Sequence, residues 1–190
     1  MKMNNTEIKT IFKNYLVLLE CHNEQKRHIS DYFRKKGIRT LEYPFFNGDY
    51  SFMIMPNSIT GNDEPLFFGT KFIIERKSGN IATGGGFQEI KGNLTVTENH
   101  KCFKAEFERL ANVDNVYLLI ENAYSIDDIK KVRQYKLSTS VFIKIFHSFM
   151  KKRNQERNEL GKKDIEIVYS HIYESGEKVM LLIKSYLESL

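Results

Sequence analysis

Short, continuous runs of apolar residues are the feature of this sequence that most constrains its fold. Residues 15–19 form one such run, which ends directly at Glu20, and residues 72–74 form another, which ends at Glu75. A short run without polar alternation is typical of a strand that is covered on both of its faces. We therefore expect a central sheet with layers packed on both sides and acidic residues at the ends of its strands.

Segments with helical spacing alternate with these runs. Asn23 can cap a helix over residues 24–36, and Gly37 supplies its end. Aromatic and aliphatic residues follow a helical period in residues 97–111 and 139–155. Further helices are predicted over residues 87–91, 125–131 and 176–187. Because helices and strands interleave, the sequence predicts the α/β class.

Extended segments account for much of the remaining chain. Residues 38–46 and 50–55 are predicted to pair as a hairpin, because the Asn47-Gly48 between them is a strong turn signal. Other strands are predicted at residues 71–77, 116–120 and 165–169, with a surface loop at 57–70. Residues 78–86 contain four glycines and are predicted to form a mobile loop.

Length and composition favour one compact domain. The chain has 190 residues, of which 41% are hydrophobic, and it shows no internal repeat or linker. No apolar run approaches the roughly 18 to 20 residues of a membrane span, and residues 1–13 lack the features of a secretory signal. Cys21 and Cys102 are too few for a disulfide framework. We expect a single domain over residues 1–190, cytoplasmic, not bound to membrane, with both cysteines reduced and packed.

The strand predicted over residues 71–77 brings an acid and a base to one face. Its period of two places Glu75 and Lys77 together and Arg76 on the other face. Such a pair is common on surface or edge strands. The apolar residues before it instead indicate an interior strand, where charges are costly unless they serve each other or a metal.

Phosphodiester hydrolysis gives these residues a chemical role. The reaction needs a hard cation, which carboxylates hold, and a positioned water. Asp49 and Glu75 are candidate ligands of the cation, and Lys77 can orient the water or help to deprotonate it. Alternatively, Asp49 is only a turn residue after the predicted hairpin turn.

The motifs Gly48-Asp49-Tyr50 and Glu75-Arg76-Lys77-Ser78 together resemble the GDY…ERKS signature of the XPF-type nuclease domain. That domain is a branch of the PD-(D/E)xK superfamily. The resemblance runs over about residues 15–121, which leaves 122–190 as a C-terminal extension of helices and a strand. It is closest to small stand-alone members from bacteria and their phages. It implies a restriction-endonuclease-like core, in which helices flank a central mixed sheet.

The resemblance also implies an activity. Members of the family cleave DNA with a divalent metal, here Mg²⁺ or Mn²⁺, and better-known members prefer flapped, forked or branched DNA. We therefore expect a structure-selective endonuclease of DNA repair or recombination in a bacterial or phage-infected cell, as a homodimer or heterodimer through the nuclease domain. The alternatives are a catalytically weak or inactive DNA-binding or scaffolding subunit, and a Holliday-junction resolvase or restriction-type nuclease on the same fold.

Roles carry over to individual residues by their match to the motifs. Asp49 and Glu75 match the family's metal ligands, and Lys77 matches its catalytic lysine. Arg76 matches the arginine between them and is expected to contact phosphate or to buttress the acids. Tyr50 and Ser78 complete the two motifs and are expected beside the site rather than on the metal.

The sequence leaves the third carboxylate open. The family ends its first strand in an aspartate with a glutamate soon after it, whereas this chain has Glu20 and Glu24. Either is a candidate metal ligand. Glu106, in a Phe-x-x-Glu-Phe pattern of the helix predicted over residues 97–111, is expected to point toward the site or to pair with Arg109.

Histidines and basic residues add weaker candidates. His22 and His28 lie near the acidic end of the first strand, where a metal or acid–base role competes with that of surface histidine. The net charge is +5, and residues 151–163 hold six Lys or Arg against two Glu. Such a run is usually a solvated helix end. Because a nuclease needs a surface for phosphates, the first three basic residues of this run are candidate DNA contacts: Lys151, Lys152 and Arg153.

The three successive glycines have several interpretations. Residues 84–86 lack the Gly-Lys-Ser/Thr that follows in a nucleotide-binding P-loop. A flexible loop that closes over DNA is one expectation for this segment, and simple disorder is the other.

Overall fold

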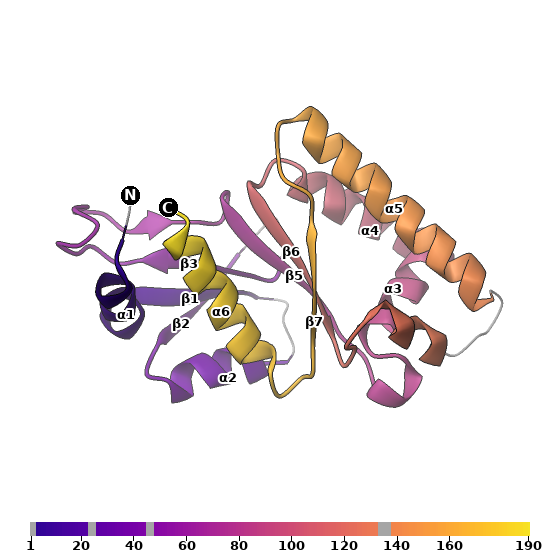
Figure 1. Cartoon of the computed structure of the whole chain (residues 1–190), viewed down its shortest axis with the longest axis horizontal. Helices are drawn as coiled ribbons and strands as arrows, with labels where there is room; N and C mark the ends of the chain where they lie inside the picture. The colour runs from indigo at the N-terminus through magenta and orange to yellow at the C-terminus, as the bar shows by residue number, and fades with distance from the viewer. Residues whose placement is uncertain (1–2, 23–25, 45–47, 133–137) are drawn as a thin grey trace.

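Seven strands form one mixed sheet at the centre of the structure. The structure is a computed structural model that describes residues 3–22, 26–44, 48–132 and 138–190 (Figure 1). Within these residues the strand order is β2-β1-β3-β5-β6-β7, and β4 pairs with β3. The strands are β1 Leu16–Cys21, β2 Arg39–Tyr43, β3 Tyr50–Ile54, β4 Leu66–Phe67, β5 Phe72–Lys77, β6 Asn115–Glu121 and β7 Glu166–Ser170.

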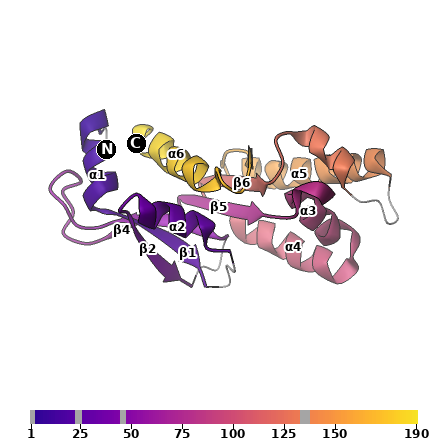
Figure 2. The same ribbon diagram turned by 90° about the horizontal axis from the view of Figure 1, so that it is seen from below.

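Helices cover both faces of this sheet, which confirms the predicted α/β class with a central mixed sheet flanked by helices. One group packs on one face and the other group on the opposite face, each around its own apolar core. Figures 1 and 2 show the first group toward one end of the molecule and the second group toward the other. The first group is α1 Asn5–Asn14, α2 His28–Lys35 and α6 Ser175–Glu188; the second is α3 Gly86–Thr95, α4 Thr97–Leu110 and α5 Thr139–Glu159.

The alternation of side chains along β5 determines which residues meet each layer. Phe72 and Ile74 pack into the core beneath α1, α2 and α6, whereas Ile73 packs into the core beneath α3, α4 and α5. Because successive residues of a strand point to opposite faces, Arg76 is directed to the first layer. Glu75 and Lys77 are directed to the second.

The predicted hairpin between β2 and β3 is wrong. Both strands pair with β1, one on each side: β2 runs parallel to it and β3 antiparallel. β1 is buried along nearly its whole length, while β2 is largely exposed, as suits the edge of a sheet. The buried run of β1 therefore lies inside the sheet, with β2 on one side of it and β3 on the other. Asn47 of the expected turn lies outside the described residues.

The glycine-rich segment is a packed crossing rather than the predicted mobile loop. Residues 81–83 form a 3₁₀ turn, and α3 begins at Gly86. Gly85 has φ +58°, and a Cβ there would lie 2.5 Å from the carbonyl oxygens of both Glu121 and Asn122. A Cβ on Gly86 would collide with the carbonyl oxygen of Lys77. Only glycine allows the start of α3 to lie this close to the ends of β5 and β6.

Other sequence predictions meet mixed outcomes. Helix α1, which begins with a capping box at Asn4, was not predicted. Cys21 and Cys102 are both free, but Cys102 is exposed, so its predicted packing role is wrong. None of the described helices combines the length and apolar character needed to cross a membrane.

Candidate active site

Asp49 meets the end of β5 because β3 and β5 are antiparallel. Tyr50, the first residue of β3, is paired with Ile74. The backbone N–H of Asp49 donates to the carbonyl oxygen of Ile74 at 2.9 Å. Its carboxylate Oδ2 accepts from the backbone N–H of Arg76 at 2.7 Å. The two motifs, distant in sequence, are therefore joined where β3 begins and β5 ends.

Gly48 makes this approach possible. Its φ is +70°, and a Cβ at this position would collide with the side chain of Ile73 and lie 3.2 Å from the carbonyl oxygen of Ile74. A larger residue would push the chain away from β5. The glycine of the Gly-Asp-Tyr motif thus has a positional role in setting Asp49 against the strand that carries Glu75.

Lys77 is the centre of the charged cluster on the α3 and α4 side. Its Nζ lies 2.6 Å from Oε1 of Glu75, 3.1 Å from Oε1 of Glu106 and 3.6 Å from Oε1 of Glu89. The lysine side chain is only 7% exposed, and Nζ also lies 5.4 Å from the ring centroid of Phe103. The structure thus brings Glu106 to Lys77, as expected, and adds Glu89, which sequence reasoning missed.

The electrostatics of this cluster follow from burial and from an excess of carboxylates. Burial, and then repulsion from Asp49, raise the pKa of Glu75 well above its usual value. Burial alone would raise the pKa of Glu106, but its hydrogen bond with Glu75 and the charge of Lys77 lower it overall. Burial alone would lower the pKa of Lys77, yet attraction to Glu75, Glu106 and Glu89 raises it.

These carboxylates suit a hard cation. Asp49 and Glu75 repel each other across a buried site, and a divalent cation would relieve that repulsion. Within the described residues, no group of three or more His, Cys, Asp or Glu side chains is arranged to hold a metal ion. Mg²⁺ commonly uses only one or two protein carboxylates and completes its shell with water and substrate phosphate. Asp49 and Glu75 therefore have the ligand chemistry that Mg²⁺ or Mn²⁺ prefers.

Glu20 lies at the same end of the strands as Asp49 and Glu75. Its side chain is on the opposite face of the sheet from Glu75. Its side chain is 1% exposed, and its Oε2 accepts from Arg27 at 2.7 Å. Arg27 also pairs with Glu42 at 2.8 Å. Glu20 is paired with Tyr50, whose side chain belongs to the core beneath α2. The expectation that Glu20 joins Glu75 at a metal is therefore not supported by this arrangement, and Glu24 lies outside the described residues.

Arg76 pairs with Glu121 on the face of the sheet opposite Glu75 and Lys77. The carboxylate of Glu121 receives Nη1 of Arg76 at 2.7 Å and lies 2.5 Å from Nε2 of His28. Glu121 is completely buried, and Arg76 is 7% exposed at its side chain. Of the two roles expected for Arg76, this arrangement supports buttressing rather than phosphate contact. His28 contacts Glu121, whereas His22 lies exposed beside Glu42 at 3.2 Å.

Sequence reasoning missed Glu121, although a signal was present. It directly follows the buried run of residues 116–120, as Glu20 follows the first run. Burial alone would raise the pKa of Glu121, but the hydrogen bond from His28 and the charge of Arg76 lower it. Glu121, at the end of a buried strand, is thus paired with Arg76 and His28 on this face of the sheet.

Tyr50 and Ser78 have different positions. The Tyr50 side chain faces the α2 layer, opposite Glu75 and Lys77, so its expected place beside the site is not supported. Tyr50 is fully buried in the core beneath α2. The backbone N–H of Ser78 donates to Oε2 of Glu89 at 2.8 Å, and its hydroxyl receives Nζ of Lys26 at 3.2 Å. Ser78 therefore links the end of β5 to α3, which agrees with its expected place beside the site.

A cavity of about 320 Å³ opens over Lys77. Helices α3 and α4 line it with polar side chains, among them Asn93, Asn99 and Arg109. The positive charge of Arg109 also contributes to the lowered pKa of Glu106. The alternative partnership of Glu106 with Arg109 therefore exists beside the contact with Lys77. The lining of the cavity thus combines two cations, Lys77 and Arg109, with two carboxylates, Glu89 and Glu106.

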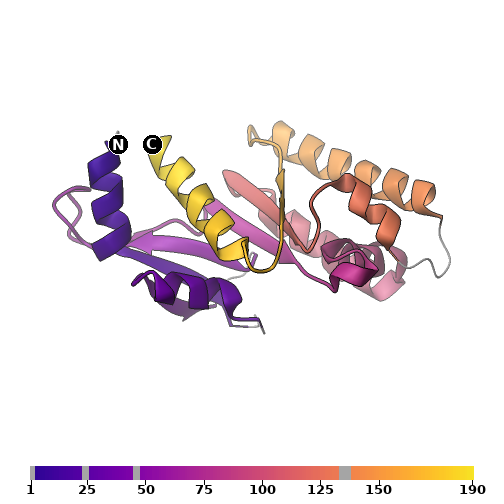
Figure 3. The same ribbon diagram turned by 60° about the horizontal axis from the view of Figure 1, so that its bottom comes forward.

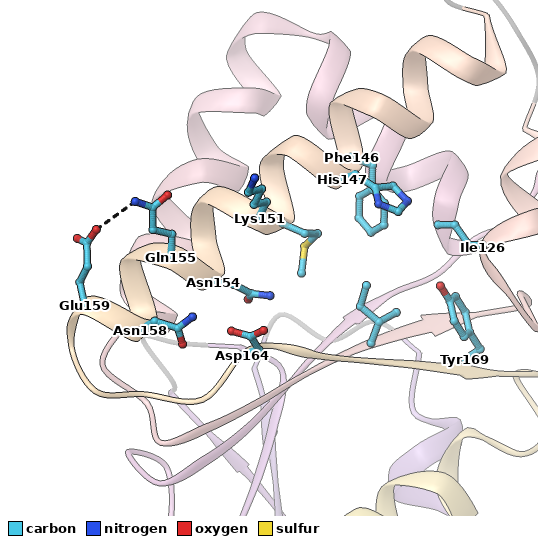
Figure 4. A pocket seen from close by; sticks show the side chains of 12 residues that line it. Ile126, Phe146, His147, Lys151, Asn154, Gln155, Asn158, Glu159, Asp164 and Tyr169 are labelled. Carbon is cyan, nitrogen blue, oxygen red and sulfur yellow. Dashed lines mark hydrogen bonds between the residues drawn. The ribbon is translucent and has the colours of Figure 1, made fainter.

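A larger cavity, of about 1000 Å³, lies between α5 and β7 and shares no lining residue with the cavity over Lys77. Figure 4 shows Asn154 and Asn158 of α5 on one side, with Asp164 and Tyr169 across from them. The cavity has no part of the carboxylate and lysine cluster. Its size therefore does not make it the site of the chemistry.

The predicted DNA contacts on α5 divide into two kinds. Lys151 and Lys152 are exposed. Arg153 is only 3% exposed, pairs with Glu156 at 2.9 Å and lies 5.4 Å from the ring centroid of Phe149. The expectation that Arg153 contacts phosphate is corrected, because its guanidinium is buried against its own helix and neighbours.

Comparisons with known proteins support the fold. No family model matches the chain, and no curated protein matches it in sequence. Among solved structures, XPF from Aeropyrum pernix is similar, with a TM-score of 0.51 and 14% identity. The match covers 91% of this chain but only 60% of that chain. At this identity the likeness concerns the fold, and it confirms the XPF-like, restriction-endonuclease-like core.

Proposed function

We propose that this chain is a metal-dependent DNA endonuclease that hydrolyses phosphodiester bonds at Asp49, Glu75 and Lys77. The observation that carries the proposal is the position of Lys77, whose buried Nζ contacts Glu75 and Glu106 beneath a polar cavity. Asp49 lies beside them, bonded to the strand that carries Glu75. The likeness of the fold to an XPF structure supports the same conclusion.

Each residue has a role that follows from its surroundings. Asp49 and Glu75 would hold Mg²⁺ or Mn²⁺, which supplies positive charge to offset the charge on the scissile phosphate. Lys77 donates hydrogen bonds that orient water and stabilise negative charge. Glu106 and Glu89 hold the Lys77 side chain in position, and Arg109 attracts the substrate into the cavity.

We further propose that the substrate is flapped, forked or branched DNA. The support is the resemblance of the motifs, and the exposed Lys151 and Lys152 offer additional phosphate contacts. A catalytically weak DNA-binding subunit is the second candidate function. Two observations favour this second candidate. Lys77 pairs directly with Glu75, and Glu20 pairs with Arg27 on the face of the sheet opposite Glu75.

Cleavage of labelled duplex, flap, fork and four-way-junction DNA tests both functions. With Mg²⁺ or Mn²⁺ we expect cutting that is fastest on a branched substrate and that stops when a chelator removes the metal. Asp49→Asn should abolish cutting while DNA binding persists, because the change removes one charge from the metal site. Binding without cutting by the parent protein would instead support the second candidate. Metal-independent cutting would contradict the proposed chemistry.

A further inference from the structure

An apolar groove lies far from the charged cluster, among α1, the end of α2 and α6. Its volume is about 330 Å³. Figure 3 shows α1 in indigo and α6 in yellow near each other, with α3 and α4 toward the other end of the molecule. Five apolar side chains line the groove: Ile8, Phe12, Ile38, Met180 and Leu181. Leu181 is 51% exposed, so this apolar surface is open to water.

Four lysines surround this groove, and none of the described residues that line it is acidic. Lys184 lies 3.6 Å from Glu188, and Lys36 lies 5.4 Å from the ring centroid of Tyr32. In the part of the chain that the structure describes, Lys9 and Lys13 are exposed and form no ion pair. The rim is therefore positively charged around an apolar floor.

We propose that this groove binds an acidic, amphipathic peptide segment of a partner protein. A large apolar side chain of the segment fills the groove, and its flanking carboxylates pair with the lysines. Helices that dock in this way present apolar anchors at helical spacing, with charges beside them. The combination of an apolar floor with a single-sign rim selects the segment by shape and by charge.

Other anionic surfaces fit these observations less well. A DNA backbone would pair with the lysines but would leave Leu181, Met180 and Phe12 exposed beneath it. A membrane surface would meet the lysines, but a concave groove of this size fits a side chain better than a flat bilayer. The proposal concerns a surface remote from Lys77, so it does not depend on the nuclease activity.

Fluorescence anisotropy with a designed probe tests the proposal on the full chain. The probe is a labelled peptide of about 12 residues with leucines at helical spacing and Asp or Glu at the other positions. A peptide of the same pattern with lysines in place of the acids is its control. We expect the acidic peptide to bind, its affinity to fall with salt, and the basic peptide not to bind.

Substitutions in and beside the groove test where the acidic peptide binds. Lys9→Glu combined with Lys13→Glu should weaken binding of the acidic peptide by about tenfold, and Leu181→Ser should weaken it as well. Lys178→Glu is the matched control, because Lys178 is exposed on α6 but does not line the groove. It should leave binding unchanged. Circular dichroism of each variant establishes that it is folded.

Several outcomes would overturn the proposal. These are no binding of the acidic peptide at about 1 mM, equal binding of the basic peptide, or equal effects of the groove variants and Lys178→Glu. A labelled duplex and vesicles of phosphatidylglycerol serve as competing ligands. If the double lysine variant loses one of these ligands while peptide binding is unchanged, the groove belongs to that ligand and the proposal fails.

Discussion

At the scale of residues, the neighbouring side chains of Glu75, Arg76 and Lys77 on β5 make different contacts. Glu75 and Lys77 face α3 and α4, where they meet Glu106. Arg76, between them, faces the opposite layer and meets Glu121. Two faces of one strand therefore separate the proposed chemistry from the contacts that hold the strand in place.

Lys77→Met should remove the proposed hydrogen-bond donor while keeping much of the side chain's bulk. We expect the cleavage rate to fall by about 10²-fold or more, with DNA binding retained. The variant should also unfold at a lower urea concentration, since buried Glu75 loses its cationic partner. Single-turnover cleavage and binding, measured on the same flap DNA, check the effect. Cleavage at the parental rate would exclude Lys77 from the mechanism.

Glu121→Gln should act on stability, because it leaves Arg76 buried without its counter-charge. We expect a loss of about 3 kcal/mol in the free energy of unfolding, measured with urea. Glu188→Gln is the control: Glu188 is 42% exposed and pairs with Lys184, itself 43% exposed, at 3.6 Å. Its change should stay within about 0.5 kcal/mol. Equal effects of the two substitutions would contradict the assigned role.

The same carboxylate predicts a pH dependence. The pKa of Glu121 is lowered in the folded protein by His28 and Arg76, against the effect of burial. Its contribution is therefore present above the unfolded value, about 4.3, and is lost as the pH falls through the folded value. The stability difference between the parent and Glu121→Gln should narrow below about pH 4. A difference that grows with acidity would reverse this assignment.

At the scale of elements, the crossing from β5 to α3 assembles one side of the site. Gly85 and Gly86 let α3 begin against the strand ends. Glu89 of α3 then receives the backbone N–H of Ser78 at 2.8 Å. Helix α4 follows immediately and supplies Glu106. The order of elements thus delivers both glutamates to Lys77.

Gly85→Ala should disturb this crossing. It combines a positive φ with a Cβ 2.5 Å from two carbonyl oxygens, and we expect a loss of about 2 kcal/mol or more in stability. Gly92→Ala, within α3, is the control. Nothing lies within 4 Å of a Cβ at Gly92, so alanine should stabilise the helix by about 0.5 to 1 kcal/mol. Urea titration of both variants measures this contrast, and equal tolerance would refute the packed crossing.

At the scale of the whole molecule, the carboxylate and lysine cluster and the groove rimmed by lysines lie on opposite faces of the sheet. The carboxylate and lysine cluster faces α3 and α4, and α5 with its exposed lysines lies on the same face of the sheet. The groove rimmed by lysines lies among α1, α2 and α6. We propose that DNA meets the first end and a partner the second.

Salt dependence of DNA binding tests the role of α5. Replacing Lys151 and Lys152 by Gln should reduce the slope of log affinity against log salt by up to about 1.8, or 0.9 for each lost phosphate contact. Lys178→Gln, on α6, should leave the slope unchanged. Equal slopes for the parent and the double variant would remove α5 from the DNA-binding surface.

Local pattern in the sequence was enough to predict the buried strands, the α/β class and the candidate trio Asp49, Glu75 and Lys77. These depend on short-range periods and on motifs a few residues long. The placement of Glu75 and Lys77 on one face, and of Arg76 on the other, follows from the strand period alone.

Only the tertiary structure decided which neighbours these residues have. It put β1 between β2 and β3, directed Glu20 to the face opposite Glu75, brought Glu121 to Arg76, and buried Arg153. The physical reason is that strand order, and the face on which each helix packs, depend on burial of apolar surface between segments distant in sequence. A local pattern indicates that a residue faces one layer of helices. The packing of those helices decides which side chains it contacts in that layer.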